Sequence, residues 1–212
     1  MSEIPTSNIN ASFDLASGSP RRRQLLAEAG FSFEIIRPEV DETPRPGEPP
    51  LEYVRRMAAG KSAAGFAMTR GRRPSLGADT VIVLGARIVG KPADYEDAVR
   101  ILSMLSGRSH NVVTSVALTT GYGVTAIETV STEVVFRPLS QAEIRAYCDT
   151  GEPMDKSGAY AIQGGAAGFV AFRNGSVTNV VGLPMEETAI MLASYGIFPL
   201  NLAPVAAAGL FF

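Results

Sequence analysis

Two long strand-like segments joined by a glycine-rich turn constrain the fold of this chain more than any other feature. Residues 112–119 and 125–136 are rich in β-branched side chains, and Gly121-Tyr122-Gly123 lies between them. This pattern predicts a pair of long antiparallel strands. Elsewhere in the chain, strand and helix patterns alternate. We therefore expect an α/β fold with a mixed β-sheet and flanking helices.

The remaining elements follow from capping and periodicity. A helix should begin at Pro20 with Ser19 as its cap, and it should end at Gly30. Ser140 and Glu143 form a capping-box pattern ahead of another helix. The proline-rich stretch 38–50 predicts a mobile loop. The other patterns predict strands at 13–17, 31–36, 80–84, 88–89, 168–172 and 176–181, and helices at 51–68, 95–105 and from Pro184 onward.

Charge and composition narrow the class of function. The 212 residues hold 19 basic and 21 acidic side chains, so the formal net charge is −2. A nucleic-acid binder more often has a net basic domain, and an anionic membrane would also select for basic residues. No apolar run reaches the roughly 18 residues of a membrane span, and residues 1–12 lack the pattern of a secretory signal. We expect a cytoplasmic protein that binds neither nucleic acid nor membrane.

Two side chains with possible chemistry occur once each. Cys148 is the only cysteine, which excludes an intramolecular disulfide, and it follows apolar positions of a predicted helix. His110 is the only histidine, and no neighbouring residue marks it as a base. We predict a buried structural thiol and a structural or solvated histidine. Hydrolytic chemistry would then depend on carboxylates, a metal ion, or both.

A short turn near the N-terminus has the features of a phosphate site. A predicted strand runs into Ser17-Gly18-Ser19-Pro20 and then into three arginines, Arg21, Arg22 and Arg23, in the first turn of a helix. Free backbone N–H groups at a helix start suit a phosphate, whereas cations there oppose the helix dipole. A bound polyanion would relieve this conflict. The alternative is a solvated basic turn.

Further candidates lie around a predicted buried strand. Asp79 comes just before residues 80–84, where it could bind a divalent cation or accept a proton from water, or could simply cap a turn. Lys91 follows one hairpin later, in Gly90-Lys91-Pro92. Lys61 continues an apolar helical stripe, so its ammonium either reaches a cleft or extends to solvent. Glu42 lies in an acidic loop with Glu39 and Asp41, whose oxygens would suit magnesium or manganese. The alternative is a solvated acidic loop that binds no metal.

The late segment 151–165 is dense in glycine and poor in apolar residues, so it either carries function or connects elements. Gln163 offers both a hydrogen-bond donor and an acceptor, which could read the edge of a pyrimidine base. Composition alone does not decide between these alternatives.

Taken together, these motifs resemble the Maf family of nucleoside triphosphate pyrophosphatases over residues 13–195. The resemblance rests on an ordered set of segments, each weak by itself, at 15–22, 77–80, 90–92, 151–164 and 180–184. It implies one catalytic domain over residues 13–195, with an N-terminal extension at 1–12 and an apolar tail at 196–212. It also implies a fold related to the inosine triphosphate pyrophosphatases, with an elongated mixed sheet and two lobes around a central cleft.

The resemblance further implies a reaction and a set of roles. A cytoplasmic homodimer would hydrolyse nucleoside triphosphates between the α and β phosphates with a divalent metal such as Mg²⁺, Mn²⁺ or Co²⁺. Asp79 would be the general base, and Glu42 and Asp79 would bind the metal. The residues implied to hold the triphosphate are Ser17, Arg21, Lys61 and Lys91.

Within the family, Arg22, Thr80 and Gln163 match the selectivity positions of the branch that acts on dTTP and UTP. Two positions depart from the family pattern: Gly60 replaces an acidic residue before the helix lysine, and Ala86-Arg87 replaces glycine-glutamate. The alternative hypothesis, from another class, is a nucleotide-binding regulator of septum formation whose catalysis is not essential.

Overall fold

The computed structural model describes residues 12–121 and 123–200. Residues 1–11 of the expected N-terminal extension and residues 201–212 of the apolar tail lie outside the described residues. Within them, one seven-stranded sheet has the order β2-β1-β3-β5-β6-β7, and β4 pairs with β3. The strands are β1 (Phe13–Ala16), β2 (Phe33–Ile36), β3 (Ser75–Leu84), β4 (Arg87–Val89), β5 (Ser109–Thr120), β6 (Gly123–Phe136) and β7 (Val170–Asn174).

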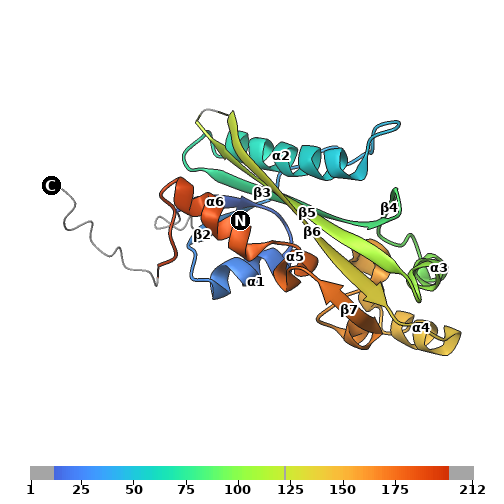
Figure 1. Cartoon of the computed structure of the whole chain (residues 1–212). Coiled ribbons are helices and arrows are strands. Elements are labelled where there is room, and N and C mark those ends of the chain that lie inside the picture. The colour runs from blue at the N-terminus through green and yellow to red at the C-terminus, as the bar shows by residue number, and fades with distance from the viewer. Residues whose placement is uncertain (1–11, 122, 201–212) are drawn as a thin grey trace, which may run out of the picture.

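The sheet is mixed, as the sequence predicts. β1 runs parallel to both β2 and β3, whereas β3, β5, β6 and β7 pair antiparallel to one another in turn. The long hairpin of β5 and β6 forms the middle of the molecule (Figure 1). Nine of the twelve residues of β5 are buried, because this strand has a neighbour on each edge and helices over both faces.

The helices form layers on the two faces of the sheet and a group at one end of it. α2 lies on one face, and α1, α5 and α6 lie on the other, while α3 and α4 are at the far end (Figure 1). No helix of the described residues is long and apolar enough to span a bilayer. The helices are α1 (Pro20–Glu28), α2 (Pro50–Met68), α3 (Tyr95–Leu105), α4 (Gln141–Cys148), α5 (Val177–Val181) and α6 (Met185–Ser194), with 3-10 turns η1 (Glu152–Asp155), η2 (Ser157–Ala159) and η3 (Gly165–Phe169).

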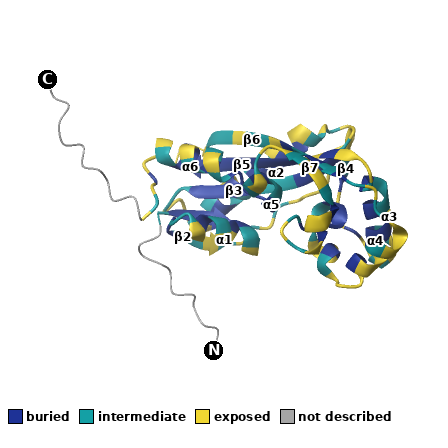
Figure 2. Cartoon of the chain, turned by 60° about the horizontal axis from the view of Figure 1, so that its bottom comes forward, coloured by how far each residue is buried: buried dark blue, intermediate teal, exposed yellow. Residues whose placement is uncertain are grey.

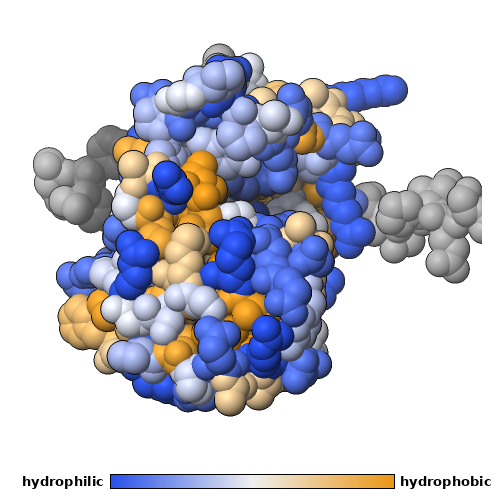
Figure 3. Space-filling model, turned by 90° about the vertical axis from the view of Figure 1, so that its right-hand side faces the viewer, coloured by the Kyte–Doolittle hydropathy of each residue, from blue (hydrophilic) through white to orange (hydrophobic). Residues whose placement is uncertain are grey.

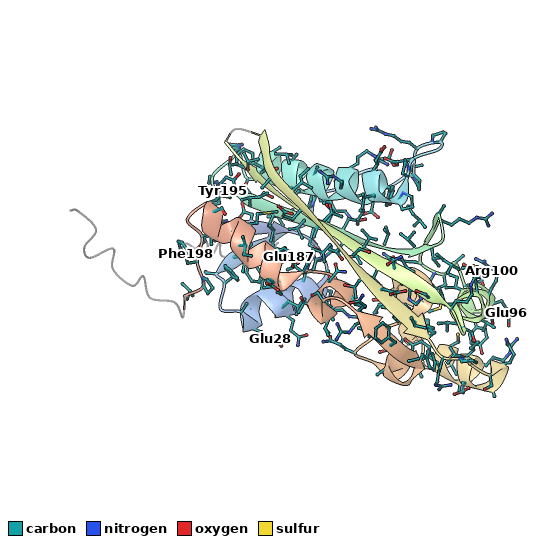
Figure 4. The ribbon with its side chains drawn as sticks, viewed as in Figure 1. Glu28, Glu96, Arg100, Glu187, Tyr195 and Phe198 are labelled. Atoms are coloured by element: carbon teal, nitrogen blue, oxygen red, sulfur yellow. The ribbon has the colours of Figure 1, made fainter. Side chains whose placement is uncertain are left out.

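Three hydrophobic clusters stabilise these layers. One cluster joins α1 and α6 to the sheet and includes Leu26 and Leu192. A second, under α3 and α4, includes Leu102 and Phe136, and a third, under α2, includes Met57. Figure 2 shows α3 and α4 as a group apart from α1 and α6, and Figure 4 places Glu96 and Arg100 at the end opposite Tyr195 and Phe198. The molecule therefore has the two predicted lobes, one that holds α1 and α6 and a far lobe that holds α3 and α4.

Capping explains why several helices begin where the sequence predicts. Ser19 accepts from the backbone N–H of Arg22 at the start of α1, and Ser140 and Glu143 form a complete capping box at α4. Cys148 is buried, as predicted. His110 is also buried, and its Nε2 lies 2.9 Å from the hydroxyl of Tyr160, which confirms a structural histidine.

One predicted strand is wrong. Residues 176–181 contain three valines and a threonine, which favour strands and predict an extended segment. They instead form the short helix α5, in which the hydroxyl of Ser176 caps the N–H of Asn179. The side-chain amide of Asn179 then donates to the carbonyl of Val112 in β5, so tertiary hydrogen bonds override the local propensity.

Candidate active site

The sheet is open along part of one edge of β3. β1 pairs with β3 as far as Gly77, and β4 pairs with it from Ile82 onward. In the part of the chain that the structure describes, no strand covers this edge at residues 78–81. Asp79 and Thr80 therefore border a cleft of about 780 Å³. Figure 3, which looks from the end that carries α3 and β4, shows a hollow between an upper and a lower part of the molecule.

The sequence predicts Asp79 just before a strand, but Asp79 lies inside β3, and the packing at Gly77 explains this difference. A Cβ at Gly77 would stand 2.4 Å from the backbone N of Ser62 and 2.5 Å from the carbonyl of Ala58, so α2 packs directly on the strand. Side chains two apart in a strand share a face, which turns Asp79 toward α2 as well. The glycine that suggested a break in the strand is required for helix packing.

Lys61 joins two carboxylates in the cleft. Its Nζ lies 2.7 Å from Oδ1 of Asp79 and 2.6 Å from Oε1 of Glu42. The side chains of Lys61 and Asp79 are only 15% and 13% exposed, whereas that of Glu42 is 56% exposed. The ammonium therefore reaches into the cleft, and three predicted site residues meet at one point.

The charges around Glu42 favour its ionised form. Burial raises the pKa of this carboxyl, but the hydrogen bond and charge of Lys61, together with the charges of Lys91 and Arg22, lower the pKa below its ordinary value overall. Two adjacent carboxylates are hard oxygen donors of the kind that Mg²⁺ and Mn²⁺ prefer. Among the described residues, no group of three acidic, histidine or cysteine side chains could hold a metal. A metal at this pair would keep most of its coordination sites for water or phosphate oxygens.

The turn before α1 forms another wall of the cleft. Ser17, Arg21 and Arg22 all line the cleft. Arg22 is buried, and it donates to the carbonyls of Gly182 (2.8 Å) and Ala78 (2.9 Å) and to the hydroxyls of Ser17 (3.2 Å) and Thr80 (3.0 Å). Burial lowers the pKa of Arg22, and the nearby charges of Asp79 and Glu42 partly offset this effect. The guanidinium is thus fixed in the wall, while the less buried Arg21 stays available to a ligand.

The far lobe contributes a third set of groups. Lys91 is exposed at the rim, and the carbonyl of Gly90 before it accepts from the N–H of Gly158 (2.9 Å), which ties the hairpin to η2. Asp155 and Lys156 also line the cleft and form an ion pair. The hydrogen bond from Lys156, together with the charge of Arg21, lowers the pKa of Asp155, whereas burial raises it less.

Some predicted residues lie elsewhere. Gln163 is exposed and does not line the cleft, although its neighbour Ile162 does. Glu39 and Asp41 are exposed outside the lining, so Glu42 is the member of that acidic loop that reaches the site.

Sequence reasoning missed two groups of the lining. Tyr53 donates its hydroxyl to the backbone carbonyl of Glu42 (2.9 Å) and so holds the acidic loop against α2. Tyr53, Met57 and Lys61 follow one another at intervals of four residues, which indicates that they share one helix face. Lys156 lay within the glycine-dense segment, but only the contact between Gly90 and Gly158 brings it to the site.

The lining as a whole is locally positive. Five cations, Arg21, Arg22, Lys61, Lys91 and Lys156, face three carboxylates, Glu42, Asp79 and Asp155, although the chain carries a net charge of −2. Such a cleft attracts a small polyanion with several linked negative groups.

A family model described as Maf-like protein matches residues 12–195. The chain belongs to the Maf family. A dTTP/UTP pyrophosphatase from Aromatoleum aromaticum is 49% identical over 91% of this chain and 98% of its own length. Another, from Chromobacterium violaceum, is 47% identical over 86% of this chain and 93% of its own. Among solved structures, a HAM1 protein from Coxiella burnetii is 16% identical, covers 87% of this chain and 99% of its own, and has a TM-score of 0.46.

Proposed function

We propose that this chain hydrolyses nucleoside triphosphates, with dTTP and UTP as substrates, to a nucleoside monophosphate and pyrophosphate. The observation that carries the proposal is the meeting of Lys61 with Asp79 and Glu42 at the open edge of β3, inside a positively charged cleft. Relatives that are nearly half identical over almost the whole chain are named dTTP/UTP pyrophosphatases, which supports the same choice of substrate.

In this reaction a water molecule attacks the α-phosphorus. The bond between the α-phosphorus and the oxygen that bridges it to the β-phosphorus then breaks. Asp79 accepts the proton that the water loses, and pyrophosphate leaves with the bridging oxygen. Ser17, Arg21, Lys61 and Lys91 hold the triphosphate, and the three cations among them neutralise its charge. Phosphoryl transfer depends mainly on positioning and charge neutralisation, so one base among several cations is sufficient protein machinery.

A divalent cation fits the carboxylates of Glu42 and Asp79. These oxygens already share one cation, the ammonium of Lys61, and hard carboxylate donors suit Mg²⁺, Mn²⁺ or Co²⁺. A bound metal would supply further neutralisation of phosphate charge and activation of water. Chelation should abolish turnover, and Glu42→Gln should raise the metal concentration needed for half-maximal activity.

Base selection is assigned to Arg22 and Thr80, which border the cleft together, and to Gln163. The assignment of Gln163 rests on the family resemblance, because this side chain lies outside the lining of the cleft. A neutral amide would match the imide edge of uracil or thymine.

The test is pyrophosphate release from dTTP and UTP with Mg²⁺, Mn²⁺ or Co²⁺. Removal of a general base typically costs about 10²- to 10⁴-fold in rate, so Asp79→Asn should lose activity on that scale while it still binds UTP in calorimetry. Asp41→Asn, an acidic loop residue outside the cleft, is the matched control and should stay active. The proposal fails if the purified wild-type protein releases no pyrophosphate from any triphosphate.

We also propose that the protein acts as a homodimer in the cytoplasm. Both statements rest on the family resemblance. Light scattering on the purified chain tests the first, and fractionation of cells that produce it tests the second.

A further inference from the structure

A line of hydrogen bonds runs from the cleft into the core. It begins at Arg22, whose Nη2 donates to the hydroxyl of Thr80 at 3.0 Å. The hydroxyl of Thr80 lies 2.9 Å from that of Thr114, its cross-strand partner in β5. Thr114 in turn donates to the carbonyl of Asn179 in α5 at 3.1 Å. Thr114 and Asn179 are fully buried, so the far end of the line has no access to water.

The number of hydrogens on each group limits the directions that this line can take. A threonine hydroxyl has one hydrogen and two lone pairs, and the guanidinium of Arg22 can only donate. Because the hydrogen of Thr114 goes to the Asn179 carbonyl, Thr80 must be the donor between the two threonines. One lone pair of Thr80 accepts from Arg22, and the other remains for the cleft.

A second arrangement of these hydrogens is possible but is weaker. If Thr114 donated to Thr80, the hydrogen of Thr80 would turn to the carbonyl of Gly182, which is 3.4 Å away. That contact is longer than the 2.9 Å and 3.1 Å bonds of the first arrangement, so the first is more stable. In that weaker arrangement Arg22 and Thr114 would fill both lone pairs of Thr80, so the free acceptor toward the cleft belongs to the first arrangement.

We infer that Thr114 is a positioning residue that makes Thr80 an acceptor toward the substrate and thereby selects a base with a hydrogen on ring nitrogen N3. The inference rests on the proposed function and deepens it. Uracil and thymine carry a hydrogen on N3, whereas cytosine has a lone pair there that would face the lone pair of Thr80. Val180 and Val181 line the cleft next to Gly182 and offer an apolar surface for the flat base.

The experiment compares kcat/KM for UTP and CTP, measured by pyrophosphate release. Thr114→Val has the same shape without the hydroxyl, so the hydrogen of Thr80 keeps only the long 3.4 Å contact with the Gly182 carbonyl and can turn to the cleft as a donor to N3 of cytosine. The ratio of UTP to CTP should fall by about tenfold, the scale of one mismatched hydrogen bond, because CTP improves relative to UTP. Thr114→Ser keeps the hydroxyl and should keep the ratio. Thr129→Val makes the same change on β6, outside the lining of the cleft, and should also keep it.

A second variant covers the case in which Thr114→Val does not fold. Thr80→Val removes the acceptor itself and leaves the bond from Thr114 to Asn179 intact. The ratio of kcat/KM for UTP to that for CTP should therefore fall in this variant as well. An active Thr114→Val or Thr80→Val enzyme with the wild-type ratio overturns the inference while the proposed function stands. A wild-type protein inactive on both nucleotides removes the proposed function instead.

Discussion

At the residue scale, Lys61 is the residue on which the site depends most directly. Its ammonium is the shared partner of Asp79 and Glu42, and its stem belongs to the buried stripe of α2. Without that ammonium, two neighbouring carboxylates would repel each other and would also repel the triphosphate. One side chain thus sets both the charge of the cleft and the position of the proposed base.

Lys61→Met keeps the apolar stem and removes the charge. We expect kcat/KM for UTP to fall by about 100-fold or more, the usual cost of removing one group that stabilises transition-state charge. Arg55→Met is the matched control, because Arg55 is exposed on the same helix and does not line the cleft. Steady-state pyrophosphate release measures both. Equal activities of the two variants would show that Lys61 does not bind the triphosphate.

His110 gives the fold a dependence on pH. Burial lowers the pKa of its imidazole to about 4, although a backbone hydrogen bond at Arg108 acts in the opposite direction. The unfolded chain, with an ordinary histidine, gains its proton near pH 6.5 and the folded chain only near pH 4. The contribution of neutral His110 to the free energy of unfolding is therefore complete above pH 6.5 and is lost as the pH falls toward 4.

His110→Gln removes this titration and keeps a polar partner for Tyr160. Between pH 7 and pH 4 the free energy of unfolding of the wild type should fall by about 3 kcal/mol more than that of the variant. Urea unfolding at the two pH values measures this difference, and other groups cancel in the comparison. Equal losses in the two proteins would contradict a buried, neutral His110.

At the element scale, the packing of α2 on β3 places Lys61 next to Asp79. This packing depends on Gly77, where a side chain would meet the backbone of α2. Gly65 serves the same helix further along, because a Cβ there would stand 2.8 Å from the Cβ of Ala16. Small residues on each side of the contact thus set the distance between the helix and the strand.

Gly77→Ala should push α2 away from the sheet. We expect a loss of at least about 2 kcal/mol in the free energy of unfolding, within the range for overpacked cores, and a loss of pyrophosphate release. Gly168→Ala is the control, since a Cβ at Gly168 would meet no atom within 4 Å. Urea unfolding compares the two variants. A Gly77→Ala protein as stable and active as the control would contradict the role given to this packing.

The same element shows what sequence reasoning could and could not predict. Helices with capping residues and strands with long β-branched runs were predicted well, because their signals are local. The start of β3 was missed because Gly77 looks like a break until α2 is seen against it. The valines of α5 predict a strand, whereas the contact of Asn179 with β5, which favours the helix, joins residues 67 positions apart in the chain.

The residues of the candidate site show the same difference between local signals and contacts of distant segments. Residues in family-like motifs, such as Ser17, Asp79 and Lys91, were found, and the structure brings them to one cleft. Thr114 has no motif around it and becomes visible only as the cross-strand partner of Thr80. Lys156 needed the contact between Gly90 and Gly158. Such residues depend on pairing between distant segments, which spacing along the chain does not record.

At the scale of the whole molecule, the cleft lies between lobes with separate hydrophobic clusters but a shared sheet. Its walls come from the α1 turn on one side and from η1, η2 and the β4 hairpin on the other. A triphosphate that contacts both walls adds interactions between the lobes that the free protein lacks. Binding should therefore stabilise the molecule as one unit.

A uridine triphosphate analogue with a methylene group between the α and β phosphates resists cleavage and can test this. At about 100 times its Kd, a ligand that binds only the folded state adds about 2.7 kcal/mol, which for a chain of this size raises Tm by about 5–10 °C. The shift should appear in a single calorimetric transition. Lys91→Ala, at the exposed rim, should leave the Tm of the free protein unchanged and reduce the shift, because the phosphates lose one cation from the far lobe. An undiminished shift in Lys91→Ala would place the nucleotide away from that wall, and two transitions would show that the shared sheet does not make the lobes unfold together.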